Sequence, residues 1–349
     1  MDDVYSQYTT GGGDIAFDTK VMHGYRRFCN KIYQATKYFI GTLEKFDKGF
    51  LPQATAGRTG KEALAERWIL SRFNTAAKEI HHALSTREFS RSTHVVYTYF
   101  YDELCDVYIE NSKAMVQNGT VVERTSALNT LYTALEGALR MIHPFMPFLS
   151  EELWQRLPRR RNDTTPSITI ASYPSYEESL YDPESEATYE LILGCSKGVR
   201  SLLSEYNIER ANVFVQTTDA KTYEIAKSQV QAIKSLAGKS WSEIAVLPPT
   251  EATPTGCAVF AVSTSAAIFL EVVGHVNIDK EITKSQVKIK KAADSINNQL
   301  QRIEGEDFKN KVSDAVQAEE RKRLEEMMSM QANYEKTLKQ FQSLKLETH

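Results

Sequence analysis

Residues 23–39 read HGYRRFCNKIYQATKYF, and this pattern predicts one amphipathic helix. Apolar residues recur at the i, i+4, i+7 and i+11 spacing that lines one face of a helix. These residues are Phe28, Ile32, Ala35 and Phe39. We expect this face to be buried against other helices.

A second row, basic and polar, lies beside the apolar row on the same predicted helix. It consists of Arg27, Asn30, Lys31, Gln34 and Tyr38, with Arg26 and Lys37 on its flanks. Cations bind phosphates, amides and guanidinium groups read base edges, and a ring stacks on an unpaired base for about 1–3 kcal/mol. The row is therefore a candidate contact for unpaired nucleotides. The alternative is a solvated basic face of an ordinary helical bundle.

The composition indicates a globular protein of two or three domains, since 42% of the 349 residues are hydrophobic and 25% are charged. The net charge of −3 means that any contact with nucleic acid must come from local basic patches. The four cysteines lie far apart and the histidines show no metal-ligand spacing, so we expect neither a disulfide framework nor a metal site. The wide spacing of the cysteines also indicates a reducing, cytosolic environment. No run of about 18 apolar residues exists, so we expect no membrane insertion.

Helical periodicity continues through the first half of the chain and predicts an antiparallel helical bundle. Further helices are expected over 61–84, 87–117 and 125–142, and Ser150 is the expected N-cap of a short helix. Arg159, Arg160 and Arg161 form a basic loop that either is solvated or contacts an RNA backbone.

The pattern changes twice in the second half. Residues 168–173 are expected to be extended and residues 184–206 helical, and short apolar runs after Asn212 predict a small α/β unit. From Ile278 onward, apolar residues repeat in a heptad-like pattern that Gly305 interrupts, which predicts an antiparallel coiled-coil hairpin. Four lysines fall on one face of its first arm and would suit a phosphate backbone, although exposed lysines are also normal on a coiled coil: Lys280, Lys284, Lys288 and Lys291.

The fold class is therefore mainly α, with a helical bundle, a small α/β unit and a C-terminal coiled-coil hairpin. The expected boundaries are a connecting loop over 1–14, a bundle over 15–165, a linker strand and helix over 166–211, the α/β unit over 212–275 and the hairpin over 276–349.

Four sequence segments, in the order in which they occur here, resemble the C-terminal region of class I aminoacyl-tRNA synthetases of the valine, isoleucine and leucine group. They are KVMHGYRRFCNKIYQATKYF, ERWILSRF, FYDELCDVYIENSK and LRMIHPFMPFLSEELWQRLP. The entry TTGGGDI and the terminal hairpin are similar to the valyl-tRNA synthetases, whereas isoleucine enzymes commonly end in cysteine-rich zinc modules. The resemblance covers essentially the whole chain and is weakest in the α/β unit.

The resemblance implies that the bundle binds the anticodon loop of valine tRNA and that the hairpin contacts the tRNA elbow. By position, Tyr38 would stack on a flipped base and Lys37 would hydrogen-bond its neighbour, while Lys20 and Lys31 fall at other basic contact positions. Lys37 stands where the family often has Arg and would lose bidentate geometry. Arg27 and Asn30 also match the family phrase, although Asn30 could equally be a structural cap.

The resemblance also implies a missing part. The HIGH-like and KMSKS-like signatures that use ATP in such enzymes are absent, so we expect a fragment of a valine-tRNA ligase that binds tRNA without aminoacylating it. ATP and Mg²⁺ would bind the missing catalytic domain, and no cofactor is expected here. We expect a cytoplasmic monomer, with a mitochondrial form and translation-protein partners of the coiled coil also conceivable. The alternatives are the equivalent region of an isoleucine or leucine enzyme and a helical protein-interaction scaffold.

Overall fold

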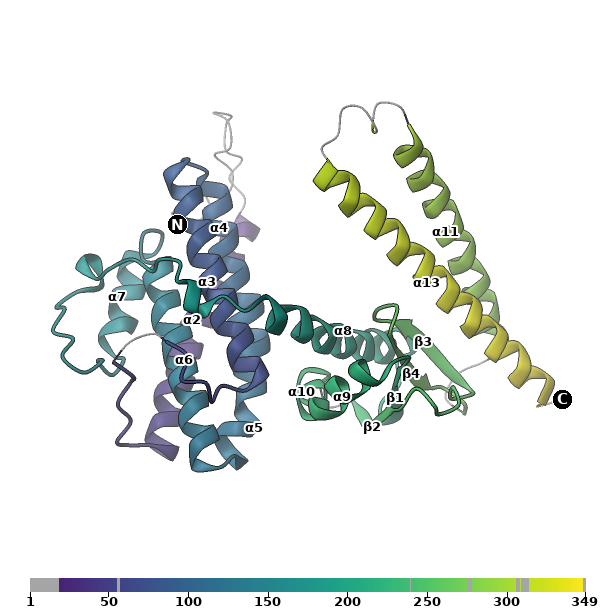
Figure 1. Cartoon of the computed structure of the whole chain (residues 1–349), viewed down its shortest axis with the longest axis horizontal. Coiled ribbons are helices and arrows are strands. Elements are labelled where there is room, and N and C mark those ends of the chain that lie inside the picture. The colour runs from purple at the N-terminus through teal and green to yellow at the C-terminus, as the bar shows by residue number, and fades with distance from the viewer. Residues whose placement is uncertain are drawn as a thin grey trace. The chain divides into compact units, whose positions relative to one another are not determined.

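The computed structural model describes residues 19–54, 57–238, 240–274, 278–305, 308 and 314–347. The expected connecting loop over 1–14 lies outside these residues. The chain divides into two compact units, Met1–Tyr189 and Glu190–His349, and the division falls inside helix α8, Pro183–Tyr206. The described residues are mainly helical, with one four-stranded sheet in the second unit (Figure 1).

The first unit is a helical bundle, as the periodicity predicts. Its segments are α2 (Thr19–Phe46), α3 (Leu64–Ser85), α4 (Phe89–Tyr97), η1 (Thr98–Ile109), α5 (Glu110–Asn118), α6 (Val121–Ile142) and α7 (Pro147–Gln155). The segment predicted as one helix over 87–117 is helical from Phe89 to Asn118, but its middle part, η1, is a π-helix.

The apolar face predicted for α2 is buried. Phe28, Ile32, Ala35 and Phe39 have at most 6% of their surface exposed. Helix α2 packs on η1, α6 and α7, and the Phe39 ring lies 6.1 Å from the ring of Tyr132 in α6. Most of the side chains of α6 are buried, so this helix is the centre of the bundle.

Two local predictions in this unit are wrong. Helix α7 begins at Pro147 and its N-cap is Met146, so Ser150 lies inside the helix, where its hydroxyl donates to the Met146 carbonyl at 2.8 Å. Residues 168–170 form a 3₁₀-helix, η2, instead of an extended segment. The Glu151 carboxylate accepts hydrogen bonds from both the Ser167 hydroxyl and the Ile168 amide, and these contacts with a remote helix fix the turn.

The second unit contains a mixed sheet with the strand order β2-β1-β4-β3. Strands β1 (Ala211–Thr217) and β2 (Trp241–Leu247) are parallel. Strand β4 (Ala266–Glu271) pairs antiparallel with β1 on one side and with β3 (Cys257–Ala261) on the other. The crossover between β1 and β2 contains two helices, α9 (Ala220–Ser228) and α10 (Val230–Leu236), where the sequence predicts one. The small α/β unit is confirmed.

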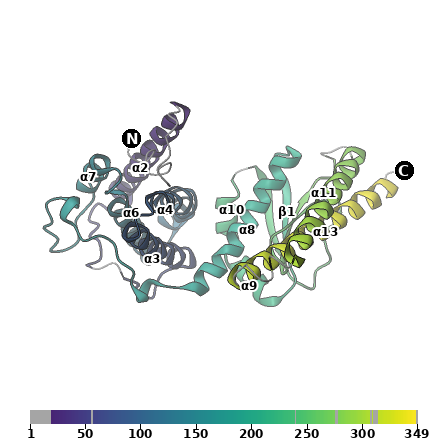
Figure 2. The same cartoon turned by 90° about the horizontal axis from the view of Figure 1, so that it is seen from above.

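Helices cover the sheet on both faces. Helix α8 approaches closely at Gly198, where a Cβ atom would lie 2.7 Å from the Phe260 ring. Figure 2 shows β1 between α8 and α10 on one side and two long helices, α11 (Ile278–Glu304) and α13 (Asp314–Glu347), on the other. The sheet is therefore the middle layer of this unit.

Helices α11 and α13 pack side by side and run antiparallel. Asp279, near the start of α11, pairs with Lys345 near the end of α13, and Arg302 pairs with Glu320 at the opposite end. Gly305 follows α11 directly, as predicted. Helices α11 and α13 thus form an antiparallel pair, while the coiled-coil hairpin stays a prediction. None of the helices in the described part of the chain is both long and apolar enough to span a membrane.

Candidate nucleic-acid interface

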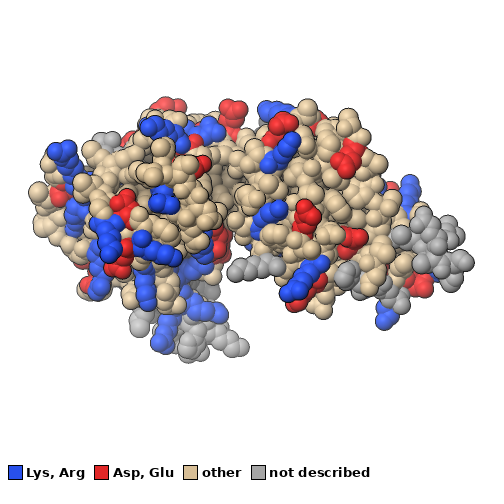
Figure 3. Space-filling model, turned by 90° about the horizontal axis from the view of Figure 1, so that it is seen from below, with Lys and Arg blue, Asp and Glu red and all other residues tan. Residues whose placement is uncertain are grey.

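The exposed side of α2 is the candidate interface because this helix is strongly basic. From Thr19 to Leu43 it contains no Asp or Glu. The side chain of Lys20 lies outside the described residues, whereas Arg26, Arg27, Asn30 and Lys37 are exposed. Figure 3 shows Lys and Arg side chains gathered on the first unit. A helix face that has cations but no carboxylates produces a local positive field, which attracts a polyanion such as RNA.

The structure separates the predicted basic row into two rows. Arg26, Asn30, Tyr33 and Lys37 follow the i, i+4, i+7 and i+11 spacing and are all exposed. Lys31 and Tyr38, which the sequence analysis places in one row with Arg27, are only partly exposed. Arg27, Asn30 and Gln34 of the predicted row are exposed as well, so the open surface extends over both rows and only Lys31 and Tyr38 are partly covered.

Lys31 is already paired. Its ammonium nitrogen lies 2.5 Å from the Asp106 carboxylate and 4.6 Å from the centre of the Tyr101 ring, and both partners belong to η1. Burial lowers the pKa of Lys31, but the hydrogen bond and the charge of Asp106 outweigh it, so the pKa lies above its usual value. The pair is partly exposed, with 33% and 47% of the two side chains accessible. Such pairs contribute at most about 1 kcal/mol, so a phosphate can compete for Lys31.

Tyr38 sits against helix α5. The ammonium nitrogen of Lys113 lies 5.7 Å from the centre of the Tyr38 ring, and Lys113 itself pairs with Glu110 at 2.6 Å. Burial raises the pKa of Tyr38 above its usual value. The ring is half-buried and still reachable, so the proposed stacking contact is sterically open on one part of the ring only.

Tyr33 is the residue that sequence reasoning missed. Its side chain is 45% exposed. Tyr33 lies seven residues after Arg26 and four before Lys37, so the i, i+4, i+7 rule applied to the exposed face would have identified it. An exposed ring between two cations is the arrangement expected of a base-stacking platform.

The arginine run over 159–161 is mainly structural. The Arg159 guanidinium stacks 3.4 Å from the centre of the Trp154 ring. Arg160 lies over the Tyr132 ring and donates to the Gln53 carbonyl at 2.6 Å, which attaches the 49–60 segment to the bundle. Only Arg161 is fully exposed within this run.

The four lysines of α11 are not equivalent. Lys280, Lys284 and Lys291 are exposed, but Lys284 pairs with the buried Glu281 at 2.6 Å. Lys288 points toward the protein: its ammonium group pairs with Glu205 of α8 and lies 5.5 Å from the centre of the Tyr334 ring.

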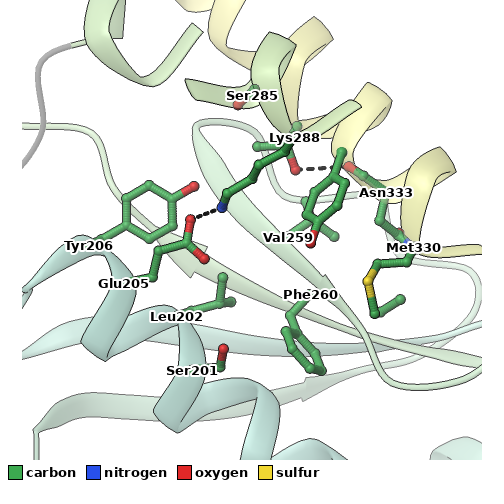
Figure 4. A pocket seen from close by; sticks show the side chains of 13 residues that line it. Ser201, Leu202, Glu205, Tyr206, Val259, Phe260, Ser285, Lys288, Met330 and Asn333 are labelled. Atoms are coloured by element: carbon green, nitrogen blue, oxygen red, sulfur yellow. Dashed lines mark hydrogen bonds and ion pairs between the residues drawn. The ribbon is translucent and has the colours of Figure 1, made fainter. Parts of the chain in front are cut away.

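Figure 4 shows Lys288 and Glu205 at a small cavity of about 70 Å³ between α8, β3, α11 and α13. Lys288 therefore links α11 to α8, and like Lys31 it is paired and only partly exposed, so it is not the fully open phosphate contact that the sequence predicts.

The C-terminal seam of α13 also faces inward. Phe341 is fully buried and the amide of Gln340 donates to the Pro254 carbonyl at 3.0 Å. Near the C-terminal end of α13, the apolar seam therefore packs inside the second unit and is not available to a protein partner. Exposed apolar side chains do remain elsewhere on the pair, at Val287, Met328 and Met330.

Comparisons with known proteins agree with the resemblance seen in the sequence. Residues 66–218 match the model of the family described as the anticodon-binding domain of tRNA ligase. The chain is 42% identical over 340 residues to a mitochondrial valine–tRNA ligase of Saccharomyces cerevisiae, covering 97% of this chain and 30% of that protein. It is 35% identical to a valine–tRNA ligase of Mus musculus over 97% of this chain and 26% of that protein.

A bacterial relative is more distant. The valine–tRNA ligase of Thermotoga maritima is 29% identical over 90% of this chain and 34% of its own length. The chain thus spans between about a quarter and a third of these relatives, and the similarity extends over both of its units. By these similarities, the chain belongs to the class I tRNA ligases that share this anticodon-binding domain, and it corresponds to a part of the valine–tRNA ligases.

Proposed function

We propose that this chain is the tRNA-binding part of a valine–tRNA ligase, in which α2 contacts the anticodon loop of valine tRNA. The observation that carries the proposal is the exposed side of α2, which has no acid from Thr19 to Leu43 and has Tyr33 and Tyr38 among its cations, in a chain that also contains the matched anticodon-binding domain. Aminoacylation with ATP and Mg²⁺ would take place in the rest of the enzyme, and this part would position the tRNA for it.

The chemistry of α2 suits unpaired nucleotides. Arg26, Arg27 and Lys37 can bind phosphates, Asn30 can hydrogen-bond a base edge, and Tyr33 and Tyr38 offer rings for stacking. Lys31 can exchange Asp106 for a phosphate. An anticodon loop presents unpaired bases and a bent phosphate backbone together, which matches this combination.

The antiparallel pair α11–α13 would contact the tRNA elbow as a coiled-coil arm. Lys280, Lys284 and Lys291 are exposed on α11 and would bind phosphates, while Lys288 links the arm to α8. The contact would then be sequence-independent, because phosphates carry no base identity.

The test is equilibrium binding of the 349-residue chain to transcripts of valine tRNA, of valine tRNA with a changed anticodon, and of isoleucine tRNA. We expect log K to fall linearly with log salt, by about 0.7–0.9 per neutralised phosphate, and we expect the changed anticodon to weaken binding. Equal affinity for all three transcripts would contradict anticodon recognition. Preference for isoleucine tRNA would favour the alternative family member.

A protein-interaction scaffold is the second candidate. The observation that favours it is the exposure of the apolar side chains of Met328, Met330 and Val287 on the helix pair. Binding of a protein partner that does not depend on salt, without binding of any of the tRNA transcripts, would support it.

A further inference from the structure

A second cavity lies in the first unit, away from the exposed side of α2. It measures about 440 Å³ and lies between α3, the start of α4 and the segment over 176–182. Its lining contains three basic side chains, two tyrosines and one acid: Lys78, His82, Arg91, Tyr176, Tyr181 and Glu79. Neither the matched family nor the proposed anticodon contact assigns a role to it.

The two tyrosine rings form an open wedge. Their centres are 6.3 Å apart and their planes are inclined by 53°. The Tyr176 hydroxyl donates to the Glu178 carboxylate at 2.9 Å, which fixes that ring, whereas Tyr181 is 43% exposed. An exposed ring beside a fixed ring provides a face on which a planar group can stack.

The backbone that carries the rings is clamped onto the bundle. Asn74 of α3 donates to the Glu177 carbonyl at 2.9 Å and accepts from the Glu177 amide at 2.7 Å. Arg58 donates to the Tyr181 carbonyl at 3.0 Å, and the Asp182 amide donates to the Ser71 hydroxyl at 2.9 Å. The segment is therefore preorganised while its rings remain accessible, which lowers the entropic cost of binding.

The basic side chains stand beside the rings and can be recruited by an anion. The ammonium nitrogen of Lys78 lies 4.8 Å from the centre of the Tyr176 ring. Arg91 pairs with Glu88 at 3.3 Å, but both side chains are nearly half exposed, so this pair contributes little stability and can exchange for a phosphate. Glu79 is the one acid among the lining residues, against the two cations Lys78 and Arg91.

We infer that this cavity binds one nucleotide, with the base stacked on Tyr181 and the phosphate held by Lys78 and Arg91. Nucleotide binding needs an aromatic ring for the base and cations for the phosphate. This cavity has both, and the segment that carries the rings is held in place by hydrogen bonds to the bundle. The nucleotide is either an unpaired residue of the tRNA or a free mononucleotide. The first source rests on the proposed function, and the second does not.

The free-nucleotide arm measures binding of AMP, UMP and inorganic phosphate to the full chain by NMR chemical shifts or calorimetry. We expect saturable binding of the nucleotides and weaker binding of phosphate alone. Tyr181→Ala should weaken nucleotide binding by about 5- to 150-fold, the loss expected for one stacked base, and Tyr181→Phe should keep it. The double change Lys78→Ala with Arg91→Ala should weaken it at least about tenfold, while the exposed Lys61→Ala serves as the control.

The tRNA arm measures the same variants against valine tRNA. A loss with Tyr181→Ala but not with Tyr181→Phe or Lys61→Ala identifies the nucleotide as part of the tRNA. Nucleotide binding with unchanged tRNA affinity identifies a free nucleotide, and this result stands even if the chain binds no tRNA at all. If AMP and UMP do not bind and Tyr181→Ala leaves tRNA affinity unchanged, the inference is overturned, whatever the α2 variants show.

Discussion

At the scale of single residues, Tyr33 and Tyr38 differ in how the fold presents them. Tyr33 is 45% exposed, whereas Tyr38 is half-buried beside Lys113. The proposed stacking role can therefore be separated from stability. A ring that only contacts RNA can be removed without cost to the fold, while a ring that also packs cannot.

Tyr38→Ala should weaken binding of valine tRNA by about 1–3 kcal/mol through loss of a stacked base, and Tyr38→Phe should be nearly silent because the stacking face remains. Tyr33→Ala should weaken tRNA binding by a similar amount with an unchanged melting temperature. Titration of labelled tRNA and thermal denaturation measure the two effects. Equal losses for Tyr38→Ala and Tyr38→Phe would show that the hydroxyl, and not the ring, is used.

Glu66 is a buried acid whose environment makes stability depend on pH. It is 1% exposed and accepts hydrogen bonds from the Ser126 hydroxyl at 2.5 Å and from the Ala63 amide at 3.2 Å. Burial raises the pKa of Glu66 to about 7, although the two hydrogen bonds lower it in part. The folded protein therefore holds a proton on Glu66 that the unfolded chain releases at lower pH.

The sign of the pH effect follows from this difference. Between the unfolded pKa of 4.5 and about pH 7, the unfolded state is increasingly favoured as pH rises, and above pH 7 the effect levels off. We expect Glu66 to remove about 2 kcal/mol of stability between pH 5.5 and pH 8.5. Urea unfolding of the wild type and of Glu66→Gln, which cannot ionise, at both pH values measures it. A constant difference between the two proteins would contradict the raised pKa.

At the scale of elements, two helical glycines lie in opposite surroundings. A Cβ atom on Gly137 of α6 would lie 2.4 Å from the buried Phe73 ring, whereas one on Gly41 of α2 would have nothing within 4 Å. Gly137 therefore sets how closely α3 and α6 pack. Gly41 only costs helix stability, because glycine lowers helix propensity by up to about 1 kcal/mol relative to alanine.

Gly137→Ala should destabilise the first unit by about 1–3 kcal/mol through overpacking. Its matched control, Gly41→Ala, should stabilise the protein by about 0.5–1 kcal/mol. Chemical denaturation followed by circular dichroism compares the two. A stabilising effect at Gly137 would mean that α3 can move away from α6 at no cost.

At the scale of the whole molecule, the proposal assigns different tRNA contacts to the two units. Lys284 and Lys291 are exposed on α11, while Lys288 pairs with Glu205 inside the second unit. The changes at these lysines should therefore have different consequences. Loss of Lys288 should affect the stability of the second unit, and loss of Lys291 should affect binding. Loss of Lys284 should affect both, because Lys284 pairs with the buried Glu281.

The double change Lys284→Ala with Lys291→Ala should weaken tRNA binding equally for native and changed anticodons. It should lower the slope of log K against log salt by about 1.4–1.8, since two phosphate contacts are lost. Lys288→Ala should instead lower the melting temperature of the chain. Binding isotherms at several salt concentrations test this, and a changed anticodon preference would count against a contact outside the anticodon.

The sequence predicts the local elements well because helix periodicity is a property of consecutive residues. The helices predicted over 23–39, 61–84, 125–142 and 184–206 correspond to α2, α3, α6 and α8, and the strands of the α/β unit also follow from the spacing of apolar side chains. The burial of Phe28, Ile32 and Phe39 follows from the same rule. The errors occur where a remote residue decides the conformation, as at Ile168, whose amide binds Glu151.

The candidate site is less predictable because its availability depends on partners that are distant in the sequence. Asp106 holds Lys31 from 75 positions away, and Glu205 holds Lys288 from 83 positions away. No periodic pattern contains such pairs. The sequence by itself determined which helices form, which face of α2 is buried and which family the chain resembles, since each depends on neighbouring residues. The tertiary structure alone decided which cations stay open and that Lys78, Arg91 and Tyr181 meet around one cavity, because these depend on how separate segments pack.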